Sequence, residues 1–530
     1  PKPKDVEKYK RGELVEPAKP IVFYIDPLTP KKWIPYLIQG VNDWQKAFEK
    51  AGFKNAIYAK VPNAKDDPEW SLEDARFSAV VYKPSDVPNA SGPSIADPRT
   101  GEILESHINW YHNVMKLLND WYFVQASPND PRARKADFDD ELMGQLIRFV
   151  SSHEVGHTLG LRHNYGSSST VPVENLRNNS WLKTNGHTPS IMDYARFNYV
   201  AQPEDKINVD NLMPRIGDYD DWAIEWGYRR FYNYNSPEKE KPFINKWTIE
   251  KLQNPRLWFG TESNPFDPRS QSEQVGDNPM IAGKYGVKNL QRVIDNLEAW
   301  STKPNEDYSV LADRYNQVSG QFSRYLGHVA KYIGGVMETP KTVEQKGAVY
   351  ELVSKTEQKE ALKFLNDYAF TTPNWILKKD VLNKINRTPV DVVSNLQNGV
   401  LNRILMNGVL ENLNKGESID INAYSLFDYL QDLKSNIFSE LKTSSKIDIY
   451  RRNLQRSFVD NLLSKTDSAT SASIIRMGSS DNSDVKALVR GTLRDIRNEA
   501  SKSASQYSDS VTKYHLEDLV YRIDKALEVK

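Results

Sequence analysis

Apolar residues in the first 110 positions follow two spacings, one typical of strands and one typical of helices. The continuous, β-rich run Ile21-Val22-Phe23-Tyr24-Ile25 predicts a buried strand. Five large apolar residues then recur at steps of three and four, which predicts an amphipathic helix that stops at Gly52: Trp33, Leu37, Val41, Trp44 and Phe48. Residues 56–61 and 75–82 predict two further strands, and residues 102–110 predict a strand at the edge of the sheet.

A second long helix is predicted downstream of these strands. Three apolar residues at helical spacing are followed by two histidines that continue the same stripe: Leu142, Leu146, Phe149, His153 and His157. Asp137 or Asp139 precedes this stripe, and either residue can cap the helix. Strands that alternate with two long helices predict an α/β domain with the histidines on its second helix.

Beyond residue 230 the pattern changes twice. Residues 231–279 are rich in Pro, Asn, Ser and charge, which predicts a connector. Helical stripes without an internal repeat follow over most of the remaining chain: Leu311–Val336, Leu396–Leu413, Phe427–Leu441 and Leu516–Leu527. The polar, Ser-rich stretch 464–484 predicts a loop.

The length of 530 residues exceeds one ordinary core, so more than one domain is expected. We expect an entry arm over 1–18, an α/β domain with the histidines over 19–230, a connector over 231–279 and an α-helical domain over 280–530.

Composition excludes several classes of function. Lys plus Arg and Asp plus Glu both number 70, so no long-range charge attracts nucleic acid or an anionic membrane. No apolar run approaches the roughly 20 residues that span a bilayer, so we expect no transmembrane segment. The chain has no cysteine, which excludes disulfides, thiolate zinc sites and a cysteine nucleophile. No signal peptide begins at Pro1, and we expect a mature or truncated product.

The residues from His153 to His163 match the pattern H-E-x-x-H-x-x-G-x-x-H, whose five fixed positions make a chance match improbable. On a helix, His153 and His157 project from one face and can reach a single ion. Gly160 lets the backbone turn so that His163 supplies a third nitrogen. Three neutral nitrogen ligands leave a fourth position open for water, which is typical of a catalytic zinc site.

Glu154 lies beside the first ligand and is the candidate general base that takes a proton from water. The remaining histidines are interpreted as packing or surface residues: His107, His112, His187, His328 and His515.

The zinc motif and the segment 190–194 together resemble metzincin metallopeptidases. Four segments, 23–27, 95–102, 153–164 and 219–228, together resemble a bacterial group of large zinc-dependent members of that clan. The sequence Ser190-Ile191-Met192-Asp193-Tyr194 supplies the methionine in a tight turn that marks this clan. The resemblance covers the first 280 residues well and the helical tail more loosely. It implies a mixed sheet above the active-site helix, with an extended substrate that pairs with the edge strand, assigned here to 102–110.

The resemblance also implies roles for residues around the turn. Met192 forms a hydrophobic base beneath the zinc ligands without binding metal, and the residues after it form a wall of the specificity pocket. Tyr194 is either a switchable zinc contact that stabilises the oxyanion or a packing residue. Asn164 follows the third histidine and matches none of the better-known branches, which leaves the subfamily open.

Three functions remain in competition. The first is a zinc endopeptidase on protein or peptide substrates, and the resemblance places it outside the cytoplasm, in the periplasm, the cell envelope or the medium. The second is a zinc hydrolase of another amide, such as a cell-wall or non-peptide substrate. The third is a catalytically silent zinc-binding or scaffold protein. The sequence leaves the oligomeric state open.

Overall fold

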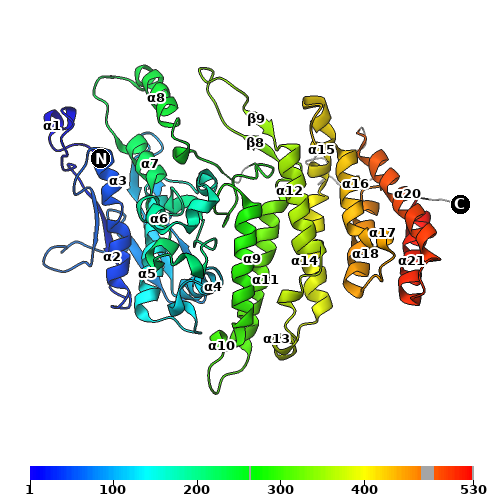
Figure 1. The fold of residues 1–530 in the computed structure, drawn as a ribbon. Helices are drawn as coiled ribbons and strands as arrows, with labels where there is room; N and C mark the ends of the chain where they lie inside the picture. Colours follow the sequence, from blue (N-terminus) through cyan, green and yellow to red (C-terminus); the bar gives the residue numbers. More distant parts are fainter. Residues whose placement is uncertain (262–263, 467–482, 528–530) are drawn as a thin grey trace. The chain divides into compact units, whose positions relative to one another are not determined.

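The computed structural model describes residues 1–261, 264–466 and 483–527, and these form two compact units (Figure 1). Unit 1 comprises Pro1–Glu262 and Arg269–Val310, and unit 2 comprises Ser263–Pro268 and Leu311–Lys530. Each unit is described by itself.

Unit 1 is built around a five-stranded mixed sheet in the order β2-β1-β3-β7-β4. The strands are β1 (Ile21–Ile25), β2 (Ile57–Lys60), β3 (Ser78–Lys83), β4 (Ala90–Ser91) and β7 (His107–Tyr111). The first three match the predicted strands. Neighbouring strands are parallel except β4, which runs antiparallel to β7.

The prediction that residues 102–110 form the edge strand of this sheet was wrong. Residues 102–110 form β6 (Ile103–Glu105), which pairs with β5 (Ile95–Ala96) in a separate two-stranded sheet, and most of β7. Strand β7 is interior because β3 and β4 hydrogen-bond to its two sides. The edge is β4, whose two residues are too short to show an alternating pattern.

Ten helices occur in the part of unit 1 that the structure describes, apart from single 3-10 turns. They are α1 (Val6–Lys10), α2 (Ile34–Asn42), α3 (Gln45–Lys50), α4 (Val114–Ala126), α5 (Asp140–Thr158), α6 (Asn179–Asn185), α7 (Asp218–Tyr228), α8 (Pro237–Lys251), α9 (Pro279–Asp295) and α10 (Leu297–Ser301). The helix predicted over 33–48 forms as the pair α2 and α3.

Helix α5 carries the histidine motif and packs closely on α2. The hydroxyls of Ser151 and Ser152 donate to the carbonyls of Leu37 and Gly40, at 3.1 and 3.0 Å. A Cβ on Gly40 would lie 2.5 Å from that of Ser151, so only glycine permits this approach. At the N-terminus the Asp139 side chain accepts from the Leu142 N–H at 2.9 Å, as expected of its cap.

The segment 231–279 differs from the expected polar connector. It contains α8, and polar residues on its later part are buried in unit 1, among them Gln271, Glu273 and Gln274. Gln271 Nε2 donates to Gln274 Oε1 at 2.7 Å, and Gln125 Nε2 donates to Glu273 Oε2 at 3.0 Å. Composition alone does not separate such a buried network from a solvated linker, because the residue types are the same.

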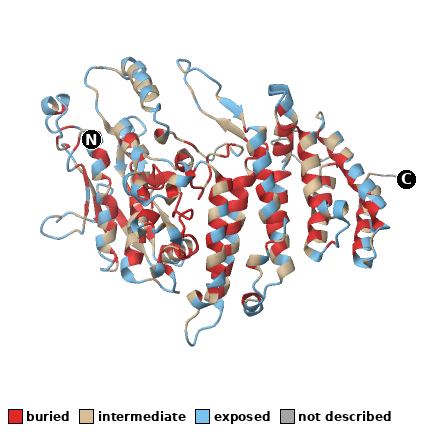
Figure 2. Cartoon of the chain, in the orientation of Figure 1, coloured by how far each residue is buried: buried red, intermediate tan, exposed pale blue. Residues whose placement is uncertain are grey.

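Unit 2 is mainly helical. Its helices are α11 (Ser309–Ala330), α12 (Lys355–Leu365), α13 (Lys379–Lys384), α14 (Pro389–Ile404), α15 (Asn407–Ile419), α16 (Leu426–Ile437), α17 (Ser439–Thr443), α18 (Ile449–Leu463), α20 (Val485–Ala504) and α21 (Ser510–Ala526). A hairpin of β8 (Val336–Glu338) and β9 (Tyr350–Leu352) adds the strands that periodicity did not predict. Buried residues recur along α11 and α14 (Figure 2). The stripe predicted over 311–336 ends in β8, and the one predicted over 396–413 is divided between α14 and α15.

The expected boundary at residue 280 falls inside unit 1, which includes α9 and α10. Asn289 on α9 donates to the carbonyls of Tyr199 and Ala201, at 2.9 and 2.8 Å, and so fastens the helix to this unit. An amphipathic stripe shows that one face of a helix is buried, but it does not show which unit that face packs against. Most of the loop predicted over 464–484 lies outside the described residues.

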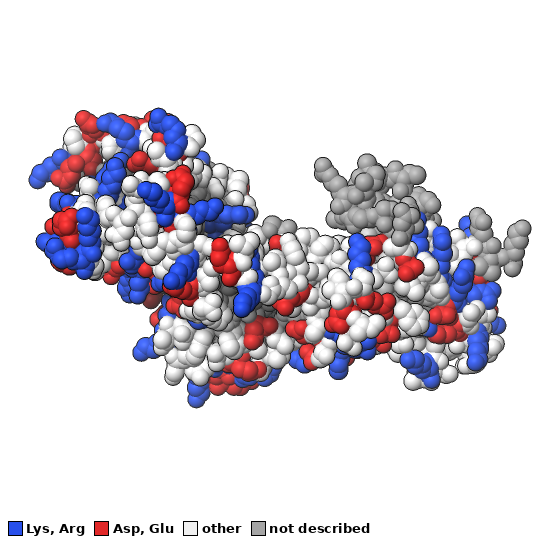
Figure 3. Space-filling model, turned by 90° about the horizontal axis from the view of Figure 1, so that it is seen from above, with Lys and Arg blue, Asp and Glu red and all other residues white. Residues whose placement is uncertain are grey.

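None of the described helices combines the length and the hydrophobicity that a bilayer span requires. On the face that Figure 3 shows, Lys and Arg are interspersed with Asp and Glu over both units.

Candidate metal centre

The structure brings the three predicted ligands together in unit 1. His153 and His157 lie one turn apart on α5, and Gly160 follows the helix with φ +92°, a left-handed conformation that favours glycine. His163 Nε2 lies 3.0 Å from His157 Nε2 and 3.2 Å from His153 Nε2. Among the described residues, these three histidines form a group of side chains that could hold a metal ion.

The other ring nitrogens orient the imidazoles toward one point. His153 Nδ1 donates to the Ile191 carbonyl at 2.8 Å, and His157 Nδ1 donates to the Leu161 carbonyl at 3.0 Å. A carbonyl oxygen can only accept, so both rings carry their proton on Nδ1 and present the lone pair on Nε2.

These donors fit zinc. Bonds of 2.0–2.1 Å in tetrahedral geometry separate two nitrogens by about 3.3 Å, close to the distances found here. Burial lowers the pKa of His153 to about 3 and that of His163 to about 4, and it also lowers that of His157. The rings are therefore neutral at pH 7, so protons do not compete with a cation for Nε2.

Glu154 is the buried carboxyl group next to the first ligand, with 7% of its surface exposed. Burial raises its pKa to about 7, while a hydrogen bond from the backbone N–H of Gly92 opposes the shift. Gly92 directly follows the edge strand β4. The candidate base thus lies where the edge of the sheet meets α5.

The predicted methionine turn lies against the ligand helix. Met192 is fully buried in a single 3-10 turn, Ile191–Asp193. A Cβ on Gly156 would lie 2.3 Å from Met192 Sδ, so the thioether packs on α5 between the first two ligands. The Met192 carbonyl accepts from the Asn164 N–H at 2.9 Å, which connects the turn to the residue after the third ligand.

Asn164 has a structural role that its sequence position did not reveal. It is fully buried, its Nδ2 donates to the Trp258 carbonyl at 2.9 Å, and its Oδ1 accepts from the Gly260 N–H at 2.8 Å. The loop that delivers His163 is therefore fastened to residues 258–260. Nothing periodic in the sequence signals this contact.

Tyr194 lies beside the ligands in a left-handed conformation, with φ 62°. Its ring centroid is 4.9 Å from that of His163 and 5.4 Å from that of His153. Burial raises the pKa of Tyr194, and the positive charge of Arg196 opposes this shift, helped by a hydrogen bond between the two side chains. The Arg196 guanidinium in turn lies 3.2 Å from the ring centroid of Trp121.

A buried ion pair supports this cluster. Arg196 Nη1 lies 2.8 Å from Glu273 Oε1, and the side chains are 10% and 1% exposed. The Glu273 N–H also donates to the Tyr194 carbonyl at 3.1 Å. Residues assigned from the sequence to the connector therefore hold the turn that carries Tyr194.

Replacing Glu273 with Ala should destabilise the protein by about 3–5 kcal/mol, because it leaves the Arg196 guanidinium buried without its carboxylate. The free energy of unfolding from urea denaturation measures this effect. As a control, Glu69→Ala removes one member of the exposed pair with Arg76 and should leave the free energy of unfolding almost unchanged. Equal effects of the two substitutions would contradict the role given to Glu273.

Asp220 holds the methionine turn through hydrogen bonds, and it was not among the functional residues predicted from the sequence. The residue is fully buried, and it accepts from Ser190 Oγ and the Ile191 N–H, both at 2.7 Å. Burial raises its pKa to about 7 against these hydrogen bonds. Asp220 belongs to the segment 219–228 that resembles metzincins, which is the signal that could have identified it.

The other five histidines have partners outside the cluster, and the ring centroid of His328 on α11 lies 6.4 Å from that of Tyr325. His107 Nε2 lies 3.2 Å from the Phe77 carbonyl, and His187 Nε2 lies 3.0 Å from the Arg196 carbonyl. His112 contacts the Tyr82 hydroxyl, and His515 in unit 2 contacts Gln455. These contacts agree with their interpretation as structural residues.

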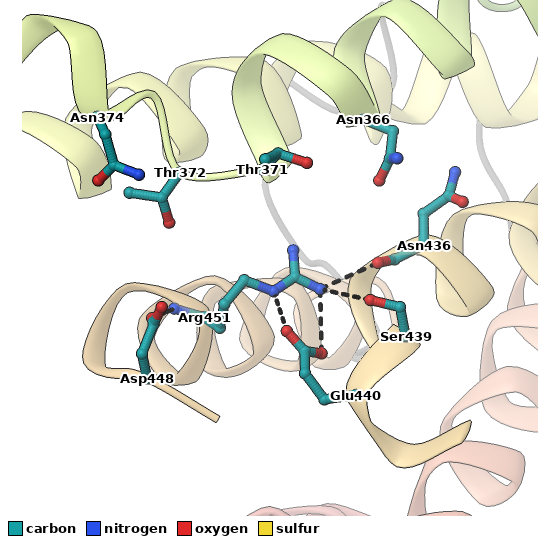
Figure 4. A pocket seen from close by; sticks show the side chains of 9 residues that line it. All are labelled: Asn366, Thr371, Thr372, Asn374, Asn436, Ser439, Glu440, Asp448 and Arg451. Atoms are coloured by element: carbon teal, nitrogen blue, oxygen red, sulfur yellow. Dashed lines mark hydrogen bonds and ion pairs between the residues drawn. The ribbon is translucent and has the colours of Figure 1, made fainter. Parts of the chain in front are cut away.

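Unit 2 contains a polar pocket of about 370 Å³ (Figure 4). Its lining includes Arg451 and Glu440, which pair with each other, and Arg451 also donates to the carbonyls of Phe370 and Ile437. The Arg451 guanidinium and the Glu440 carboxylate at this pocket are thus already paired with each other. The candidate chemistry of the described residues lies in unit 1.

Comparison with known proteins agrees with this geometry. A family model described as Met-zincin matches residues 135–445, more than half of the chain. The match confirms the predicted clan and the predicted fold class of a mixed-sheet catalytic domain with a helical C-terminal region. No curated protein and no solved structure matched the chain. Met-zincins are zinc-dependent metallopeptidases, and this chain belongs to the Met-zincin family.

Proposed function

We propose that the protein is a zinc-dependent endopeptidase that hydrolyses peptide bonds in protein or peptide substrates. The proposal rests on the convergence of three neutral imidazole nitrogens beside a buried carboxyl group, Glu154, in a member of the Met-zincin family.

The residues have distinct roles in this proposal. His153, His157 and His163 hold zinc, which when bound supplies the Lewis acidity that polarises a peptide carbonyl and makes water nucleophilic near neutral pH. Glu154 takes the proton of the attacking water and later gives it to the nitrogen of the leaving amine. Its burial supports this exchange, because burial raises the pKa of Glu154 above that of an ordinary carboxyl group and so favours a residue that both accepts and releases a proton.

Tyr194 and Met192 complete the proposed site. The Tyr194 ring packs on two of the ligands, and we assign its hydroxyl to stabilising the oxyanion. Met192 forms the apolar base of the site and stays outside the ligand set. The residues that follow Met192 form a wall of the specificity pocket.

The corrected edge of the sheet changes where we expect substrate to bind. Strand β4 pairs with β7 through Ala90 and Ser91, which leaves its other side as the edge of the sheet. An extended peptide that added to this edge would run beside Gly92 and Glu154. We therefore assign substrate pairing to β4 in place of residues 102–110.

Gly92→Ala tests this arrangement. A Cβ at residue 92 would lie 2.3 Å from the Glu154 carbonyl oxygen and 3.2 Å from Thr158 Cγ2, so the end of β4 must move away from α5. Misplacement of a catalytic group by about 1 Å can cost about 100-fold in rate, so we expect kcat/KM to fall by about 10- to 100-fold with zinc content unchanged.

The matched control for Gly92 is Gly227→Ala on α7, where a Cβ meets no atom within 4 Å. This control should retain the peptidase activity of the unmodified protein. Full activity of the Gly92→Ala protein would contradict the proposed position of substrate and base.

Two other functions remain alternatives, and one experiment separates them. The zinc-loaded protein is incubated with a diverse peptide mixture, with and without a chelator, and products are read by mass spectrometry. Cleavage at defined peptide bonds that the chelator stops supports an endopeptidase. Turnover only of other amides, such as cell-wall fragments, supports a different zinc hydrolase. Zinc binding without turnover supports a silent zinc-binding or scaffold protein.

We also propose a cellular location for the protein: it acts outside the cytoplasm, in the periplasm, the cell envelope or the medium. The proposal rests on the resemblance of the chain to metzincin metallopeptidases. Fractionation of cells, followed by detection of the protein in each fraction, tests this assignment.

A further inference from the structure

The third histidine of the candidate metal centre is held differently from the other two. Nδ1 of His153 and of His157 each donates to a main-chain carbonyl oxygen. Nδ1 of His163 lies instead 2.9 Å from the hydroxyl oxygen of Tyr165, with the ring centroids 5.0 Å apart. A carbonyl oxygen can only accept, whereas a hydroxyl can donate or accept.

We propose that Tyr165 is a positioning residue that orients His163 for zinc, which rests on the proposed zinc site. When the Nε2 lone pair of His163 faces the ion, the ring proton lies on Nδ1 and is donated to the Tyr165 oxygen. When the proton moves to Nε2, the Tyr165 hydroxyl turns and donates to Nδ1. The same contact therefore holds the ring in both neutral tautomers.

The backbone around Tyr165 is fixed well enough for this role. The Tyr165 carbonyl accepts from the Gln271 N–H at 3.3 Å, and the next residue, Gly166, donates its N–H to the Gly260 carbonyl at 3.2 Å. A Cβ on Gly166 would lie 2.3 Å from the Trp258 ring, so the turn packs tightly there. The phenol is consequently presented to His163 from a turn fastened on both sides.

Tyr165 acts through His163, in contrast to Tyr194. Its hydroxyl bonds to the ring nitrogen that points away from the metal position. It is therefore expected to govern zinc affinity and ring orientation, with any effect on turnover at saturating zinc much smaller than the effect on affinity.

The test is the zinc affinity of the full chain, measured by competition with a chromogenic chelator. Tyr165→Phe retains the ring and removes only the hydroxyl, and it should weaken zinc binding by about 10- to 100-fold. The matched control is Tyr228→Phe, which removes a hydroxyl that donates to the Leu159 carbonyl just after α5, at 3.0 Å. This control should bind zinc within about twofold of the unmodified protein.

A second measurement reads the tautomer directly. The ¹⁵N resonances of the His163 ring, in zinc-loaded protein, should show Nδ1 protonated and bonded in the unmodified chain, and a perturbed Nδ1 signal in Tyr165→Phe. Equal zinc affinities and equal Nδ1 signals in the two proteins would overturn the proposal. An equal loss in Tyr228→Phe would overturn it too, since general packing would then explain the effect. If the unmodified chain binds no zinc, the proposed function falls together with this inference.

Discussion

Glu154→Gln should lower kcat/KM for peptide cleavage by at least about 100-fold, and up to about 10,000-fold, while one zinc per chain stays bound. This is the range that a positioned general base contributes. The amide has the size of the carboxyl group, and its oxygen can still accept from the Gly92 N–H, so the substitution removes only the proton acceptor. Steady-state kinetics on a cleaved peptide, together with the zinc content of the same sample, measures both quantities.

A carboxyl group elsewhere on α5 supplies the control for Glu154. Glu141 is exposed in the first turn of the helix, and Glu141→Gln should leave both activity and zinc content unchanged. Cleavage by Glu154→Gln at the rate of the control would remove Glu154 from the mechanism. Loss of zinc from Glu154→Gln would instead show that the carboxyl group holds the metal centre together.

His157→Ala should reduce zinc from about one ion per chain to nearly none after dialysis against a buffer with a weak chelator. His157 supplies one of three nitrogens, and its Nε2 lies 3.0 Å from that of His163. Two nitrogens leave the ion without the third protein ligand that catalytic zinc sites use. Elemental analysis measures the zinc content. Stabilisation of the unmodified protein by added zinc, read as a rise in Tm, should also disappear in the variant.

His112→Ala is the control for the ligand substitution, because His112 is an exposed histidine of unit 1 that contacts Tyr82. It should keep its zinc. Full zinc content in His157→Ala would exclude this residue from the ligand set, and loss of zinc from both variants would point to a general effect of unfolding.

The ligand helix was predictable because its signals are local. The spacing of His153 and His157 and the cap at Asp139 depend on residues within one helix. The strands β1, β2 and β3 were likewise readable as short apolar runs. Local patterns therefore gave the elements that carry the candidate site.

The parts that support the site were not predictable in this way. Strand β4 has two residues, and no alternation can be read from so few. The contacts of Asn164 with residues 258–260, and of Arg196 with Glu273, join positions about 80 to 100 residues apart. Such contacts depend on tertiary packing, which a single sequence does not record as a period or a motif.

A polar composition was also misleading, for a physical reason. A buried polar group is stable when its hydrogen bonds are satisfied inside the protein, so Gln271, Glu273 and Gln274 are as compatible with a core as with solvent. Because these residues are buried and Glu273 contacts Arg196 and Tyr194, the segment after α8 helps to hold the candidate site in place.

Zinc titration of the chelated protein, with peptide hydrolysis as the readout, tests whether this chain is a zinc-dependent peptidase. The protein is freed of metal, zinc is added in steps, and cleavage of one peptide substrate is followed. We expect no cleavage without zinc, a linear rise in the cleavage rate as zinc is added, and a plateau at one zinc per chain. One zinc bound per chain without any hydrolysis of a diverse peptide set, or hydrolysis that persists without the metal, would contradict this expectation.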